Sequence, residues 1–141
     1  MSTKDLKALQ RRFVEEFNKG KKSALAVIDE IAATNLVFHS ADGRDMSLKD
    51  YKQECNELFD AFPDLHVTID DMVAEGDKVV VRKTFTGTHK GELVGIPPTI
   101  KKVTSWAVQI DRFSGGKFVE GWERFDTLDL MQQLGVIPTP E

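Results

Sequence analysis

Apolar residues recur at helical spacing in the first sixty residues of the chain. A helix is predicted over residues 3–17, after the capping-box sequence Ser2-Thr3-Lys4-Asp5. The same spacing predicts a second helix from a cap at Ser23 and a third that starts at Ser47 and stops at Pro63. The apolar positions of the first helix are Leu6, Leu9, Phe13 and Phe17.

Further along the chain, the apolar pattern changes to alternation with period two, which is typical of strands. The predicted strands are residues 36–39, 65–74, 78–86, 100–112 and 117–126. Glycine-containing turns separate the long strands into two hairpins, and a short helix over 128–134 ends the pattern. Helices followed by long antiparallel strands predict one α+β domain over residues 1–141, with the helices covering one face of a curved sheet.

Alternation along the second hairpin divides its residues between two faces. A three-residue loop would place Phe113 opposite Lys117. One face would then carry Ala107, Gln109, Gly121 and Glu123. The opposite face would carry Trp106, Val108, Ile110, Glu120 and Trp122. This second face is more apolar than a monomer comfortably exposes, so we expect a symmetric homodimer through Trp106 and Trp122.

Composition narrows the classes of protein to consider. The 141 residues fit one domain, and a net charge of -4 argues against a nucleic-acid-binding protein, which usually has a basic face. The single cysteine, Cys55, cannot form an internal disulfide, and no window of about 18 apolar residues predicts a membrane span. We therefore expect a cytoplasmic protein without a membrane or nucleic-acid partner.

Glu123 is the leading candidate for chemistry. The sequence has no nucleophile elbow, phosphate-binding glycine loop or metal-binding motif, and its three histidines are too dispersed to predict a metal site. A lone carboxylate acts as an acid or base when an apolar pocket raises its pKa, but a strand glutamate is more often a surface group. His39 and Gln109 are polar groups in apolar neighbourhoods, for which a structural hydrogen bond is the simpler interpretation.

Motifs along nearly the whole chain occur in the order found in one known family. They are Ala61-Phe62-Pro63-Asp64, Glu75-Gly76-Asp77-Lys78-Val79-Val80-Val81-Arg82, Gly87-Thr88-His89-Lys90-Gly91, Gly95, Pro97-Pro98-Thr99, Gly116-Lys117-Phe118-Val119-Glu120-Gly121-Trp122 and Gln133-Leu134-Gly135. Together they resemble the SnoaL-like polyketide cyclase, or ester cyclase, family. The resemblance implies a nuclear-transport-factor-2-like (cystatin-like) cone, in which N-terminal helices pack on a strongly curved antiparallel sheet and enclose one pocket.

The resemblance also implies a chemistry. Cyclases of this family close a ring by intramolecular aldol condensation, with a carboxylate as acid and base and without a metal or organic cofactor. Their catalytic aspartate corresponds to Glu123, a pocket histidine to Gln109 and a pocket asparagine to His39. Glutamate keeps the acid/base function but glutamine cannot exchange a proton, so the aromatic polyketide substrate does not carry over. The residues expected to contact a substrate are Phe13, Phe17, Ala107, Gly121 and His89.

Three hypotheses follow. The favoured one is a cofactor-free cyclase, isomerase or hydratase in which Glu123 takes a proton beside a substrate carbonyl while Gln109 and His39 hydrogen-bond the enolate. The second is a protein that binds a small apolar or carbonyl-containing molecule without chemistry. The third is an interaction scaffold with a filled cone. A desolvated Glu123 favours the first, and a tight salt bridge from Glu123 favours a structural role.

Overall fold

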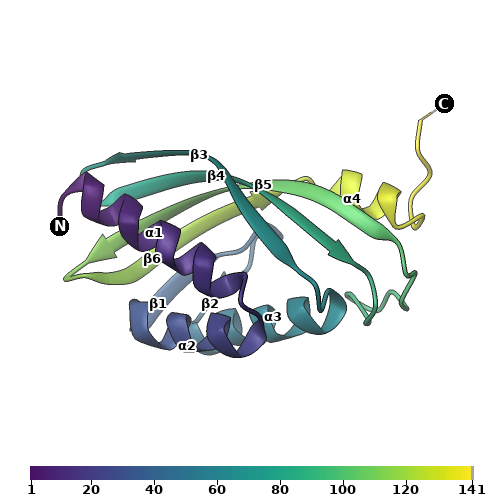
Figure 1. Cartoon of the computed structure of the whole chain (residues 1–141), viewed down its shortest axis with the longest axis horizontal. Helices are drawn as coiled ribbons and strands as arrows, with labels where there is room; N and C mark the ends of the chain where they lie inside the picture. Colours follow the sequence, from purple (N-terminus) through teal and green to yellow (C-terminus); the bar gives the residue numbers. More distant parts are fainter. Residues whose placement is uncertain (141) are drawn as a thin grey trace.

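A curved six-stranded sheet bends over three helices, and a fourth helix packs near the opposite end of the sheet (Figure 1). This computed structural model describes residues 1–140. The helices are α1 (Thr3–Phe17), α2 (Lys21–Ile31), α3 (Leu48–Ala61) and α4 (Thr127–Gln133). The strands are β1 (Ala32–His39), β2 (Asp45–Met46), β3 (His66–Glu75), β4 (Lys78–Thr88), β5 (Lys102–Ser114) and β6 (Lys117–Phe125). This arrangement confirms the predicted α+β cone.

Local capping signals set two of the helix starts. Ser2 and Ser47 each accept a hydrogen bond from the backbone N–H three residues later, and the aspartate at that position bonds back, so both predicted capping boxes are confirmed. The predicted cap of α2 is wrong. That helix starts at Lys21, with Gly20 at the N-cap position (φ 116°), while the Ser23 hydroxyl donates to the Glu16 carboxylate. Ser23 therefore ties α2 to α1 instead of capping α2.

The sheet places β1, the first strand of the chain, next to β6, the last one. Its strand order is β2-β1-β6-β5-β4-β3, and β1 pairs with β6 in parallel whereas the other pairs are antiparallel. The prediction of a purely antiparallel sheet missed this pair. It also started β1 four residues late, at residue 36 instead of Ala32. The long β1 carries the chain from α2 back across the sheet, which places the helices on its concave side.

A two-residue turn and a bulge set the register of the second hairpin. Gly115 and Gly116 have φ of 59° and 77°, which favour glycine, so Phe113 pairs with Phe118 and not with Lys117 as predicted. A register shift after Arg112 then compensates for the shorter loop. As a result Gln109 lies opposite Glu123, and the predicted division of faces is confirmed for both strands.

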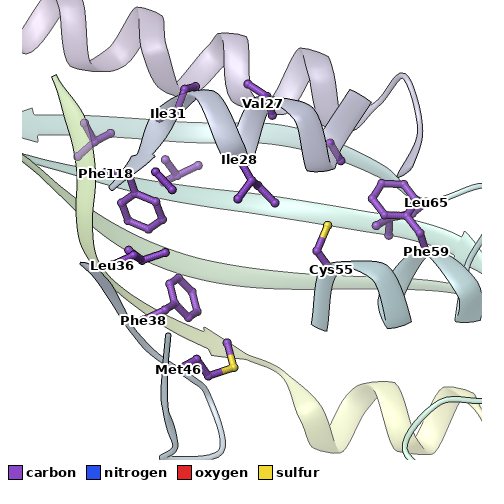
Figure 2. Close-up of a cluster of buried hydrophobic side chains, with 14 of the residues drawn as sticks. Val27, Ile28, Ile31, Leu36, Phe38, Met46, Cys55, Phe59, Leu65 and Phe118 are labelled. Carbon is purple, nitrogen blue, oxygen red and sulfur yellow. The ribbon is translucent and has the colours of Figure 1, made fainter. Parts of the chain in front are cut away.

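The space between the helices and the sheet is filled by apolar side chains. Figure 2 shows Ile28 of α2 and Phe59 of α3 directed at the sheet, with Phe38 and Phe118 on the sheet side. Phe38 and Phe118 meet edge to face, with ring centroids 6.3 Å apart. No helix within residues 1–140 is long and apolar enough to cross a membrane.

Gly121 is the position where this packing leaves no room for a side chain. A Cβ there would lie 2.7 Å from Phe118 Cζ and 2.8 Å from Phe38 Cδ2. We therefore expect Gly121→Ala to lower the free energy of unfolding by about 1–3 kcal/mol, measured by urea denaturation. Phe118→Leu should also destabilise the protein, but combining it with Gly121→Ala should cost less than the sum of the two. Strict additivity would show that the rings do not limit this position.

Candidate functional site

Buried polar side chains line the inner face of the sheet under α1. Asp111 on β5 accepts a hydrogen bond from Gln10 Nε2 of α1 at its Oδ2 and from Gln109 Nε2 at its Oδ1, both at 2.7 Å. All three residues are buried. Two amide groups therefore satisfy a carboxylate that has lost its contact with water.

An ion pair continues this group towards β6. Lys83 Nζ of β4 lies 2.9 Å from Glu123 Oε2 and also donates a hydrogen bond to Gln109 Oε1. The side chains of Lys83 and Glu123 keep 14% and 12% of their surface exposed. Solvent therefore reaches this pair, whereas Asp111 lies behind it. We call Gln10, Asp111, Gln109, Lys83 and Glu123 the inner polar row.

The inner polar row contains one cationic and two carboxylic side chains. The pKa of Asp111 is raised to about 6, mainly by burial and to a smaller extent by the nearby Glu123 carboxylate. The hydrogen bonds from Gln109 and Gln10, together with the charge of Lys83, act in the opposite direction. Burial also raises the pKa of Tyr51 of α3 well above its ordinary value, with contributions from Asp111 and Glu123. Asp111 therefore titrates close to neutral pH.

Sequence reasoning identified two members of the inner polar row, Gln109 and Glu123, and missed the other three. Asp111 follows Gln109 by two residues on the same strand, so the alternation that placed Gln109 inside also placed Asp111 inside. That signal was available. Gln10 lies four residues after Leu6 on α1, and Lys83 lies two residues after Val81 on β4, so periodicity also placed both on the buried faces, although their residue types are typical of surface groups.

His39 lies on the other face of the sheet. β1 pairs with β6 so that His39 is opposite Trp122, and the two rings stack at 5.2 Å. Its Nε2 contacts Glu120 Oε2 at 2.8 Å and its Nδ1 contacts Asp45 Oδ1 at 2.7 Å. The hydrogen bonds that the His39 ring donates to Glu120 and Asp45 raise its pKa. The structure does not bring His39 together with Glu123, so its predicted contact with a shared enolate is not supported.

The residues expected to contact a substrate are scattered. The space facing Gly121 is filled by Phe38 and Phe118, and Ala107 is completely buried. Phe13 and Phe17 of α1 stack on each other at 5.3 Å and pack against the core. Two of these four residues lie directly opposite members of the inner polar row, Ala107 opposite Lys83 and Gly121 opposite Asp111.

His89 stabilises the start of the loop that follows β4. It is fully buried against Phe62, with ring centroids 5.6 Å apart, and its Nδ1 accepts a hydrogen bond from the Thr99 backbone N–H at 3.2 Å. The backbone of His89 also pairs with Ile100 and Lys101. The backbone pairing of His89 therefore joins the two ends of the loop between β4 and β5.

Two hollows within residues 1–140 lie outside the cone. One, of 680 Å³, lies between α2, β1 and α3 and includes Leu25, Thr34 and Lys52. The other, of 450 Å³, is on the outer sheet face beside Val108 and Trp122, with Glu123 also contributing to its lining. In the described part of the chain, no three His, Cys, Asp or Glu residues are grouped so that they could hold a metal ion.

The buried state of Asp111 makes a testable prediction about stability. Because its pKa is higher in the folded protein than the ordinary value of 3.8, Asp111 favours folding at low pH, and this contribution is lost as the pH rises through about 6. Asp111→Asn should therefore be more stable than the unmodified protein at pH 7.5, by up to about 3 kcal/mol, and the difference should shrink below pH 4. Chemical denaturation across this pH range measures the effect.

Asp77→Asn, in the exposed β3–β4 turn, is the matched control and should change little at any pH. Equal destabilisation by Asp111→Asn at pH 4 and pH 7.5 would contradict the prediction.

Both the sequence and the fold of this chain are similar to those of known proteins. The model of the SnoaL-like polyketide cyclase family matches residues 7–134. The hydroxylase candidate AclR from Streptomyces galilaeus is 31% identical with a TM-score of 0.89, over 99% of this chain and 87% of AclR. The polyketide cyclase candidate IdmH from Streptomyces antibioticus is 26% identical with a TM-score of 0.79, over 92% of this chain and 97% of IdmH. No match was found among curated proteins. The chain belongs to the SnoaL-like polyketide cyclase family.

Proposed function

We propose that this protein is a cofactor-free cyclase, isomerase or hydratase that acts on a small carbonyl-containing substrate, with Glu123 as the acid and base. The observation that carries the proposal is the position of Glu123 on the inner face, in the one part of the inner polar row that solvent reaches. Gln109 and Lys83 lie beside it. Membership of a cyclase family supports the same class of reaction.

The proposed reaction is an exchange of one proton between Glu123 and the substrate. The Glu123 carboxylate takes a proton from the carbon next to a carbonyl group, and the C–H electron pair forms an enolate. The enolate carbon then attacks a second carbonyl of the same molecule and closes a ring. Glu123 returns its proton to the resulting alkoxide, so the protein ends in its starting state without an added oxidant or cofactor.

The adjacent apolar surface suits the carbon skeleton of such a substrate. Phe85 of β4 and Phe125 of β6 meet edge to face at 5.9 Å, and the Lys83 ammonium lies 5.1 Å from the centre of the Phe85 ring. About 40% of the Phe125 surface is exposed. The aromatic pair therefore offers an apolar wall next to the charged pair.

The alternative is a protein that binds a small molecule without transforming it. Its support is that the polar groups of the inner polar row already bond to one another, and that the two hollows lie outside the cone. In this case Glu123 is the counter-ion of Lys83. The two functions differ in whether the Lys83–Glu123 ion pair must open for a ligand to react.

A cytoplasmic location is part of the proposal. Its support is Cys55, the single cysteine of the sequence, which is buried in α3. Burial raises the pKa of its thiol to about 12, so the thiol stays protonated.

We also propose a homodimer through the outer sheet face. Trp106 is 48% exposed there, and Val108, Ile110 and Trp122 are partly exposed on the same face. Exposed aromatic and β-branched residues on adjacent strands are typical of a surface that a second copy covers.

Replacement of Glu123 tests the catalytic proposal. The probe is 2,6-heptanedione, whose intramolecular aldol addition gives 3-hydroxy-3-methylcyclohexanone, and consumption of the open-chain dione is followed by NMR. The unmodified protein should accelerate closure, and Glu123→Gln should lower the acceleration by about 100-fold or more because the amide cannot take a proton.

Glu120→Gln is the matched control, because Glu120 lies on the same strand but faces outwards. Equal acceleration by the unmodified protein and Glu123→Gln would rule out the proposed role of Glu123. Binding of the dione without any acceleration would favour the alternative function.

The oligomeric state tests the proposed dimer. Sedimentation velocity at micromolar concentration should give a dimer, and Trp106→Glu should convert it to a monomer because the new charge would be buried without a partner. Val94→Glu, at an exposed loop tip, should leave the dimer intact. A monomeric unmodified protein at the same concentration would refute the proposal.

A further inference from the structure

We propose that Lys83 binds the negatively charged oxygen of an enolate, which makes an enolised 1,3-dicarbonyl compound the ligand class of the inner site. The inference rests on the proposed function, because it assigns the group that stabilises the enolate next to Glu123. It does not depend on the family resemblance, which implies a histidine at the position of Gln109. Lys83 lies on the neighbouring strand, opposite Ala107.

The ammonium group of Lys83 is fixed by three neighbours. It donates to Gln109 Oε1, pairs with Glu123 Oε2 at 2.9 Å and lies over the Phe85 ring. Within residues 1–140, Gln109 and Glu123 are its oxygen partners. An ammonium group carries three hydrogens, so one donor remains for a ligand. Solvent reaches part of the Lys83 side chain, of which 14% is exposed.

The buried end of the inner polar row determines how Gln109 is oriented. Gln109 Nε2 donates to Asp111, and this turns the amide oxygen towards Lys83. Gln10 occupies the other carboxylate oxygen of Asp111. Asp111 is thus a positioning residue, because it orients the amide that holds the ammonium group. The cation is in place before a ligand arrives, which is the condition for electrostatic stabilisation without rearrangement.

The charges balance through the proposed step. Before proton transfer, the negative charge next to Lys83 is on Glu123. After transfer, Glu123 is neutral and the charge is on the substrate oxygen. The ammonium group then changes its partner from the carboxylate to the enolate, and the net charge of the site stays the same. In a largely buried site this exchange is favourable because no charge is left unpaired.

The surroundings of Lys83 select the rest of the ligand. The Phe85 and Phe125 rings provide an apolar wall beside the cation. A planar, singly charged enolate with an apolar ring or chain fits this combination. A neutral diketone of the same size can use the wall but gains much less from the cation.

The test compares binding of two diketones by NMR titration. One is 5,5-dimethylcyclohexane-1,3-dione, which is an enolate at pH 7.5. The other is 2,2-dimethylcyclohexane-1,3-dione, which cannot form that enolate and stays neutral. Glu123→Gln should bind the enolate about tenfold or more tightly than the neutral dione, because Lys83 has then lost its competing carboxylate. The unmodified protein should show the same preference more weakly, because Glu123 competes for Lys83 and Asp111 is ionised at pH 7.5.

Lys83→Met and the double variant Lys83→Met/Glu123→Gln should lose the preference. The double variant removes both charges of the ion pair and so leaves no unpaired charge that would unfold the protein. Lys102→Met is the matched control, because Lys102 is exposed on β5, and it should bind as the unmodified protein does.

Two results would overturn the inference. One is equal binding, or no binding, of the two diones by Glu123→Gln at millimolar concentration. The other is an unchanged preference in the double variant. The ring-closure assay separates this inference from the proposed function: enolate binding that depends on Lys83, without ring closure, rules out the enzyme and leaves the Lys83 site standing. Ring closure that needs Glu123 but tolerates Lys83→Met rules out the role of Lys83 alone.

Discussion

The burial of Asp111 is the constraint on which the inner site depends. A carboxylate inside a protein must find hydrogen-bond donors, and Asp111 finds them in Gln10 of α1 and Gln109 of β5. The first contact joins α1 to the sheet, and the second fixes the amide that holds Lys83. Asp111, which is itself unfavourable to bury, thus determines where Gln10, Gln109 and Lys83 lie. The raised pKa of Asp111 indicates that the fold retains this carboxylate at a cost in stability near neutral pH.

The register of β5 against β6 places Asp111 on the inner face of the sheet. The bulge after Arg112 corrects the short glycine turn, so that Asp111 lies opposite Gly121 and Gln109 lies opposite Glu123. Gly121 has no side chain, and the Phe38 and Phe118 rings fill the space in front of it. The interior of the cone is therefore filled at Gly121. The polar groups that solvent reaches, Lys83 and Glu123, lie further along the strands.

Features with local causes could be predicted from the sequence, and features that depend on distant contacts could not. The capping boxes at Ser2 and Ser47 and the long strands follow from spacing within a few residues. The parallel pairing of β1 with β6 joins segments about 80 residues apart, and no sequence period indicates it. That pairing places His39 beside Trp122 on the outer face, away from Glu123.

The same limit explains the incomplete picture of the site. Alternation along β5 and β6 placed Gln109 and Glu123 on one face correctly, because both strands belong to one hairpin. Lys83 comes from the preceding strand, and Gln10 comes from a helix a hundred residues earlier in the chain than Asp111. Residue type alone would class both as surface groups. They are buried because the carboxylates of Asp111 and Glu123 need partners, which α1 and β4 supply.

The net charge of the inner polar row affects how strongly the site attracts an anionic ligand. With Asp111 ionised, one ammonium faces two carboxylates, and the excess negative charge disfavours a second anion in the site. Protonation of Asp111 removes that excess and leaves the Lys83–Glu123 pair neutral overall. Because the Asp111 pKa lies at about 6, a modest fall in pH below neutrality shifts the row towards its neutral state. An anionic ligand is then held by Lys83 without opposition from Asp111, so the buried carboxylate controls how strongly the accessible cation attracts a ligand.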